Sequence, residues 1–128
     1  MGFLRSIRGR LARARAVRVG FRVERGTKVD PRAIVRPKRR GDITLGEGTK
    51  IHPYALLASH GGLITLGRFC SVNSFAVLYG RGGLTIGDDI RIAAHAVIVP
   101  ANHVFADPDA PIRTQGLTKE GVVIERDV

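Results

Sequence analysis

The side chains of this 128-residue chain that could exchange a proton near neutral pH are its four histidines. The ordinary pKa of an imidazole lies close to physiological pH, so a histidine can take the proton of a weak nucleophile as that nucleophile attacks. His103 stands apart because the segment around it, VPANHVFADPDAPIRTQGLTKEG, interrupts an otherwise regular pattern. A repeat protein expels such an interruption as a loop, and these loops commonly carry function. The break in the pattern therefore singles out His103 as a candidate functional residue.

The pattern that this segment interrupts is an aliphatic residue at every sixth position. It runs in phase through three blocks, each opened by an aliphatic residue and a glycine. A less regular block, called the worn block below, precedes them. The aliphatic positions are Leu45, Ile51 and Leu57; Leu66, Val72 and Leu78; Ile86, Ile92 and Ile98; and, in the worn block, Val17, Val23, Val29 and Val35. A period of six suits neither an α-helix nor an alternating sheet, but it suits a chain that turns a corner every six residues.

Three such units close one triangular coil, so the sequence predicts an all-β, parallel β-helix over residues 17–128. We expect Leu45, Leu66 and Ile86 to form one inward column, and glycine after the aliphatic residue to relax unusual corner dihedrals. Small residues fill the corners, and Cys70 occupies such a slot as a core filler. SHGG at 59–62 and GRGG at 80–83 supply bulges at one corner. An antiparallel meander or barrel would not explain three blocks in phase.

These repeats resemble those of the hexapeptide-repeat transferases. The resemblance implies a left-handed parallel β-helix, an exception to the usual right-handed crossover, and usually a homotrimer. The block IGDDIRIAAHAVIVPANHVFADPDAPIRTQG more narrowly resembles the sugar O-acetyltransferase branch, which includes maltose, galactoside and exopolysaccharide acetyltransferases. In that branch a strand ends in a histidine, and a loop with Asp-Pro and Pro-Ile-Arg follows; here the inserted loop spans about 100–121.

That resemblance implies a CoA-dependent O-acetyltransferase of polysaccharide biosynthesis. His103 would be the general base that helps a sugar or glycan hydroxyl attack acetyl-CoA, a cosubstrate rather than a bound cofactor. Asn73 matches the position of an acceptor-binding asparagine. Some relatives bring an acidic acceptor ligand near the end of the same strand, where this chain has Tyr79, Gly80 and Arg81, so the acceptor stays open.

The remaining polar candidates have less defined roles. Arg113 could contact the phosphates of CoA or structure the loop, and both interpretations stay open. His52, His60 and His95 are expected at exposed corners rather than as ligands of a metal.

The charge of the chain is strongly positive, +10 at pH 7, and is concentrated in the first forty residues, where Glu24 and Asp30 are the only acids. Residues 1–16 form a basic N-terminal segment whose apolar spacing permits a short amphipathic helix. It would dock on an anionic membrane or cap the open end of the domain. The motifs and stacking aromatics of a specific nucleic-acid module are lacking. A single cysteine and the lack of a secretory signal fit the cytoplasm, including the inner face of its membrane.

Two other functions stay open at this stage. A zinc enzyme like the γ-class carbonic anhydrases would share the fold and place three histidines between subunits, two of them at short spacing; here Pro100 separates His95 from His103. The chain also stops at VVIERDV, inside a hexapeptide unit, so we expect it to be truncated at the C-terminus. It would then be a non-catalytic remnant or scaffold.

Overall fold

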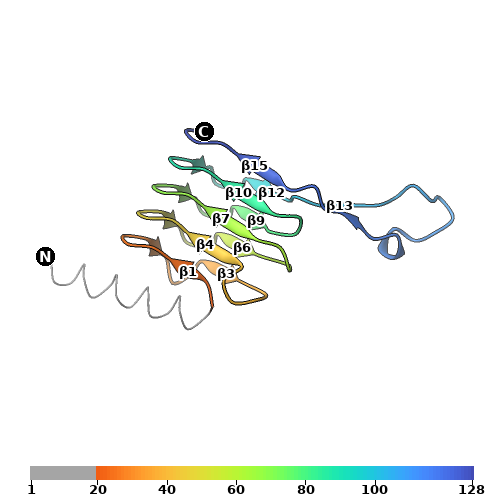
Figure 1. Ribbon diagram of the computed structural model, residues 1–128, viewed down its shortest axis with the longest axis horizontal. Coiled ribbons are helices and arrows are strands. Elements are labelled where there is room, and N and C mark those ends of the chain that lie inside the picture. The colour runs from red at the N-terminus through yellow and green to blue at the C-terminus, as the bar shows by residue number, and fades with distance from the viewer. Residues whose placement is uncertain (1–19) are drawn as a thin grey trace, which may run out of the picture.

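The structure, a computed structural model, describes residues 20–128. The basic segment expected at 1–16 and Val17 lie outside the described residues. Short strands wind into a parallel β-solenoid of four coils, each coil with one strand on each of three sheets, as Figure 1 shows. The predicted parallel β-helix is confirmed, while its left hand stays a prediction from the resemblance.

Each sheet contains one strand from every coil. The first sheet is β1 (Arg22–Val23), β4 (Ile43–Leu45), β7 (Ile64–Leu66), β10 (Leu84–Ile86) and β15 (Val122–Ile124). The second is β2 (Lys28–Val29), β5 (Lys50–Ile51), β8 (Ser71–Val72) and β11 (Arg91–Ile92). The third is β3 (Ile34–Arg36), β6 (Leu56–Ala58), β9 (Val77–Tyr79) and β12 (Val97–Ile98). An antiparallel pair, β13 (Asn102–His103) and β14 (Leu117–Thr118), stands apart from them.

The core follows the six-residue spacing. Leu45 pairs in register with Leu66, and Leu66 with Ile86, and all three side chains are buried. The predicted inward column is thus confirmed. Within residues 20–128 the single helical element is a 3-10 turn, η1 (Ile112–Thr114), and no helix there is long and apolar enough to cross a membrane.

Three corners join the sheets. The first corner, from the first sheet to the second, is residues 24–27, 46–49, 67–70 and 87–90; the second, from the second sheet to the third, is residues 30–33, 52–55, 73–76 and 93–96. The third corner, from the third sheet back to the first, is residues 37–42, 59–63, 80–83 and the inserted segment 99–121. The two predicted bulges therefore lie at the same corner as the insertion.

The structure gives a different reason for glycine at the first corner from the one that the sequence predicted. Gly46, Gly67 and Gly87 are not among the residues with positive φ. Instead they lie where coils come closest: a Cβ on Gly67 would be 2.6 Å from the carbonyl carbon of Gly87. Left-handed backbone occurs two residues later, at Phe69 (φ 55°) and Asp89 (φ 59°). The glycines are required for space rather than for dihedral freedom, and this corrects the interpretation made from the sequence.

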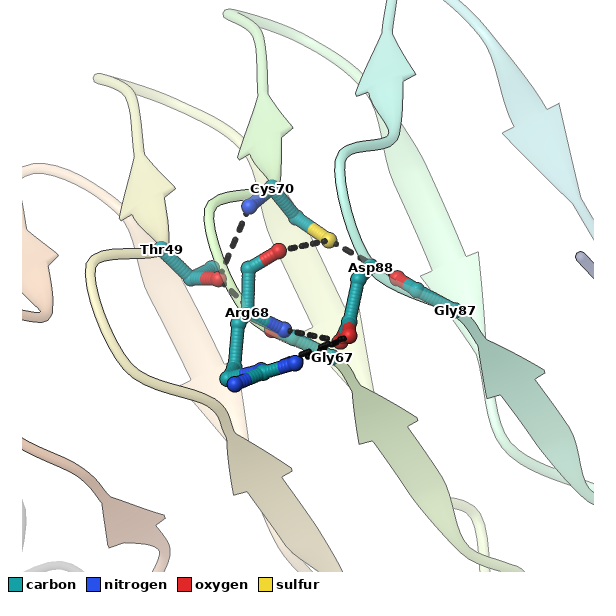
Figure 2. Close-up of polar contacts among 6 residues, drawn as sticks. All are labelled: Thr49, Gly67, Arg68, Cys70, Gly87 and Asp88. Carbon is teal, nitrogen blue, oxygen red and sulfur yellow. Dashed lines mark hydrogen bonds and ion pairs between the residues drawn. The ribbon is translucent and has the colours of Figure 1, made fainter. Parts of the chain in front are cut away.

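The small-residue slot at the first corner also makes hydrogen bonds between coils. The hydroxyl of Thr49 donates to the carbonyl of Gly67 at 2.8 Å, and one coil on, the thiol of Cys70 donates to the carbonyl of Gly87 at 3.0 Å (Figure 2). Thr27 makes the same bond to Gly46 at 2.9 Å. Cys70 is buried as predicted, and it also satisfies a buried carbonyl, which accounts for a thiol where alanine would fill the space.

Candidate active site

His103 lies on an arm that leaves the solenoid at the third corner. After β12 the chain departs at Val99, and in Figure 1 the arm extends away from the stacked coils. His103 pairs with Leu117 across the β13–β14 ribbon, and the amide of Val104 donates to the carbonyl of Gly116 at 3.1 Å. The side chain of His103 is exposed and forms no hydrogen bond with other residues in the range 20–128. The ribbon holds the backbone of His103, and its imidazole is open to solvent.

The base of the arm is anchored on the preceding turn of the same corner. Pro100 is buried, and a Cβ on Gly82 would collide with the Pro100 carbonyl oxygen. On the return, the amide of Val122 donates to the carbonyl of Gly83 at 2.9 Å, and β15 pairs with β10. The arm is therefore attached at both ends to residues 80–83.

The tip of the arm is closed by Gln115, whose part the sequence did not reveal. Its Nε2 donates to the carbonyls of Asp107 and Ala110, each at 2.8 Å, and its Oε1 accepts from the amide of Asp107 at 3.0 Å. Arg113 lies on η1 within this tip, exposed. A glutamine between Thr and Gly gives no local signal of such a role, because its partners are five and eight residues away.

Asn73 lies at the second corner, so within one chain it and His103 are on different corners. The side-chain amide of Asn73 donates to the carbonyl of Ile92 at 2.8 Å, and its backbone amide donates to the same oxygen at 3.0 Å. The side chain is half-buried. Its carboxamide oxygen has no hydrogen-bond partner among residues 20–128 and is the atom that could accept from a sugar hydroxyl.

The second corner also contains an exposed stack of rings. The rings of Tyr54 and Phe75 are 5.4 Å apart and nearly parallel, and those of Phe75 and His95 are 5.2 Å apart. The guanidinium of Arg32 lies over Tyr54 at 5.7 Å. His95 is exposed, as expected, but stacking on Phe75 gives it a structural contact that the sequence did not predict. Its φ of 62° places it in a left-handed turn.

The other ionisable groups form no metal cluster among residues 20–128. At the first corner, Arg68 and Asp88 form an exposed ion pair with Nη2 and Oδ2 3.0 Å apart, drawn in Figure 2. The backbone amide of Arg68 donates to Asp88, and so does its guanidinium. Both hydrogen bonds lower the pKa of that carboxyl, the backbone one more strongly. The same carboxylate raises the pKa of Arg68. This pair joins two coils and lies away from the arm.

Comparison with known proteins places the fold. No family model and no curated protein sequence matches this chain. Among solved structures it is similar to a mutant of AntD, an N-acyltransferase from Bacillus cereus in complex with dTDP and coenzyme A, with a TM-score of 0.66 and 19% sequence identity. The match covers 88% of this chain and 61% of the AntD chain. This chain therefore shares its β-solenoid fold with AntD and spans less than two thirds of the AntD chain.

Proposed function

We propose that this protein is a CoA-dependent acyltransferase of the hexapeptide-repeat type, which moves an acetyl group from acetyl-CoA to a hydroxyl of a sugar or glycan. The observation that carries the proposal is His103, exposed on a ribbon-stiffened arm at the one large break in a regular solenoid. The fold likeness to an acyltransferase bound to coenzyme A supports CoA as the donor. The sugar hydroxyl as acceptor rests on the sequence resemblance.

The chemistry asked of His103 is proton transfer in both directions. Its neutral imidazole takes the hydroxyl proton as the sugar oxygen attacks the thioester carbonyl, and a tetrahedral oxyanion forms. The intermediate then breaks its carbon–sulfur bond, and the imidazolium returns the proton to the departing thiolate of CoA. An acetyl ester and free CoA result, and His103 is regenerated.

We propose further that the working protein is a homotrimer. Asn73 and His103 lie at different corners of one chain, so an acceptor held by Asn73 would meet His103 of another copy. Arg113, on the exposed arm tip, would contact the phosphates of CoA. Residues 1–16 would contact anionic lipid at the inner face of the cytoplasmic membrane, since their charge is strongly basic.

The test measures release of free CoA thiol by the 1–128 chain with acetyl-CoA and methyl glycosides as acceptors. His103→Ala should lower kcat by roughly 10²–10⁴-fold while the KM for acetyl-CoA changes little, because a general base acts on the proton that moves in the transition state and adds little to binding of the donor. Asn73→Ala should mainly raise the KM of the acceptor. His95→Ala, the matched exposed histidine, should stay close to wild type.

Mixing the two impaired variants tests the trimer in the same assay, at an acceptor concentration below the KM of Asn73→Ala. If one site uses residues of two copies, His103→Ala and Asn73→Ala chains refolded together should regain part of the activity that each lacks alone. Near-normal turnover by His103→Ala would disprove the assigned base. If glucosamine were acetylated at its nitrogen and no hydroxyl were acetylated, the acceptor would be an amine and not a hydroxyl. If no acceptor gave turnover, the result would favour the non-catalytic scaffold.

A further inference from the structure

A basic groove lies on the outer side of the third sheet, next to the third corner. Its volume is about 280 Å³, and its walls are two cationic side chains, Arg36 and Lys38, and two rings, His60 and Tyr79. Leu56, Ala58 and Pro37 supply an apolar lining. The proposed mechanism uses none of these residues.

The strand register explains the hollow. Arg36 pairs with Ala58, and Ala58 pairs with Tyr79, so the three residues form one outward column across β3, β6 and β9. A short alanine side chain between two long ones leaves a depression, and the column places a cation at one end and an aromatic ring at the other. The imidazole of His60 packs edge-on against Tyr79, with ring centres 4.5 Å apart, which fixes both rings.

The turn that carries Lys38 is held by a buried polar network. The hydroxyl of Ser59 accepts from the backbone amide of Lys38 at 2.7 Å and donates to Asp42 at 3.0 Å. The same carboxylate oxygen of Asp42 accepts from the amide of Arg39 at 2.8 Å. Ser59 and Asp42 are both buried. The backbone of the turn that carries Lys38 is therefore fixed before a ligand binds, which reduces the entropy lost on binding.

The cations of the groove are not neutralised by neighbouring acids. Within residues 20–128 the ion pairs are Arg32–Asp30 and Arg68–Asp88, and neither involves the groove. Asp42, the carboxylate of the adjacent turn, is buried in its own hydrogen bonds. Two free cations over a concave, partly apolar surface favour an anion attached to an organic group.

The groove also leads toward the arm. Val77 pairs with Val97 and Leu78 with Ile98, so Val99, where the arm begins, follows beside Tyr79. From Arg36 to this point the column crosses three strand spacings, about 14 Å. A ligand held at Arg36 and Lys38 would thus extend along the sheet toward the base of the arm that carries His103.

We propose that this groove binds the phosphate end of a phosphorylated organic substrate, with Arg36 and Lys38 as the phosphate ligands and Tyr79 against the organic part. The proposal rests on the proposed acyl transfer for the identity of that substrate, which is either CoA itself or a phosphate-activated sugar acceptor. A terminal phosphate offers three strongly accepting oxygens and a charge of about −1.5 to −2 to a guanidinium and an ammonium together, whereas a carboxylate offers two oxygens and a single charge.

The experiment is calorimetric titration of the 1–128 chain at low salt with CoA, with dTDP and with pyrophosphate. Arg36→Ala/Lys38→Ala should weaken binding of the true ligand by at least about tenfold, since each lost charge-assisted bond contributes roughly that much. Lys28→Ala/Lys50→Ala is the matched control: it removes the same charge from two exposed residues of the second sheet and should bind as wild type does.

Comparison of the three ligands identifies which kind of molecule supplies the phosphate. Selective weakening for CoA assigns the groove to the donor, and selective weakening for dTDP assigns it to a nucleotide-linked acceptor. The proposal would be overturned if Arg36→Ala/Lys38→Ala bound every ligand as tightly as the control Lys28→Ala/Lys50→Ala does. It would also be overturned if the wild-type chain bound none of the ligands. His103→Ala should bind these ligands as the wild-type chain does. Binding by the wild-type chain without acyl transfer to any acceptor would count against the proposed acyl transfer and leave the groove proposal standing.

Discussion

Replacing Gly67 with alanine tests whether close approach of the coils, rather than dihedral freedom, requires glycine at the first corner. The added Cβ would be 2.6 Å from the carbonyl carbon of Gly87, where ordinary contact begins at 3.4 Å. The coils must therefore separate by about 0.8 Å, the difference of those two distances, or the backbone must distort. Glu24 takes the equivalent place in the first described coil, so a side chain is accommodated against Gly46, and the test asks whether the approach at Gly67 can adjust in the same way.

The magnitude follows from the hydrogen bonds between these coils. The amide of Gly67 donates to the carbonyl of Ile86 at 2.8 Å, and opening by about 0.8 Å would stretch this bond beyond the usual limit. The thiol of Cys70, in the same coil as Gly67, also donates to the carbonyl of Gly87 at 3.0 Å. Losing or straining one or two such bonds costs about 1 kcal/mol each, and overpacking costs about 1–3 kcal/mol. We expect Gly67→Ala to lower the free energy of unfolding by about 1–3 kcal/mol.

Thermal unfolding followed by circular dichroism measures this effect, and for a chain of this size the expected loss corresponds to a fall in Tm of roughly 5–15 °C. Gly26→Asn is the control. Gly26 has φ +73°, and an added Cβ there would make only ordinary contacts, the nearest at 3.6 Å. Its equivalents in later coils, Phe69 and Asp89, carry side chains at positive φ. Because asparagine tolerates left-handed backbone, the cost should stay below about 1 kcal/mol. Unchanged stability of Gly67→Ala, or an equal loss in Gly26→Asn, would refute the steric argument.

Two further outcomes are expected. Because hydrogen bonds from Arg68 lower the pKa of Asp88 below 3.8, the ionised carboxylate stabilises the folded chain above that pH, and this contribution is lost as the pH falls through the depressed pKa. The Tm difference between wild type and Asp88→Asn should therefore shrink on acidification from pH 6 to pH 3, and a constant difference would contradict the role of the pair. Residues 1–16 should bind vesicles containing phosphatidylserine and release them as salt rises above about 0.1 M, where screening acts within about 10 Å; equal binding to uncharged vesicles would leave them a capping role.

The sequence predicted the core of the fold because the core depends on a single repeating condition. Every sixth residue must be aliphatic, and residues of successive coils then fall into register, as Leu45, Leu66 and Ile86 do. Contacts between coils join residues about twenty positions apart. The spacing therefore predicts which residues are neighbours, but not what their side chains do when they meet.

The parts that could not be predicted are such side-chain contacts. The thiol of Cys70 satisfies a carbonyl of the next coil, and His95 stacks on Phe75. The groove arises from the short side chain of Ala58 between Arg36 and Tyr79. In the sequence these three residues are separated by whole coils, and nothing in the local pattern marks them as partners. The sequence likewise did not predict that Asn73 and His103 lie at different corners, because this depends on which strands precede each residue in the folded coil.

The lengths of the three corners explain why the arm that bears His103 leaves the solenoid at the third corner. The first corner always has four residues, from 24–27 to 87–90, and so does the second, from 30–33 to 93–96. An inserted residue at either would shift the next strand by one place and turn its aliphatic residue outward, because side chains alternate along a strand. The third corner varies from six residues (37–42) to five (59–63), four (80–83) and then 23 (99–121). It can vary because each of its loops lies outside the stack and returns the chain to the same register. Among residues 20–128, added chain is therefore accommodated at the third corner, where the arm bearing His103 leaves the stack beside the basic groove.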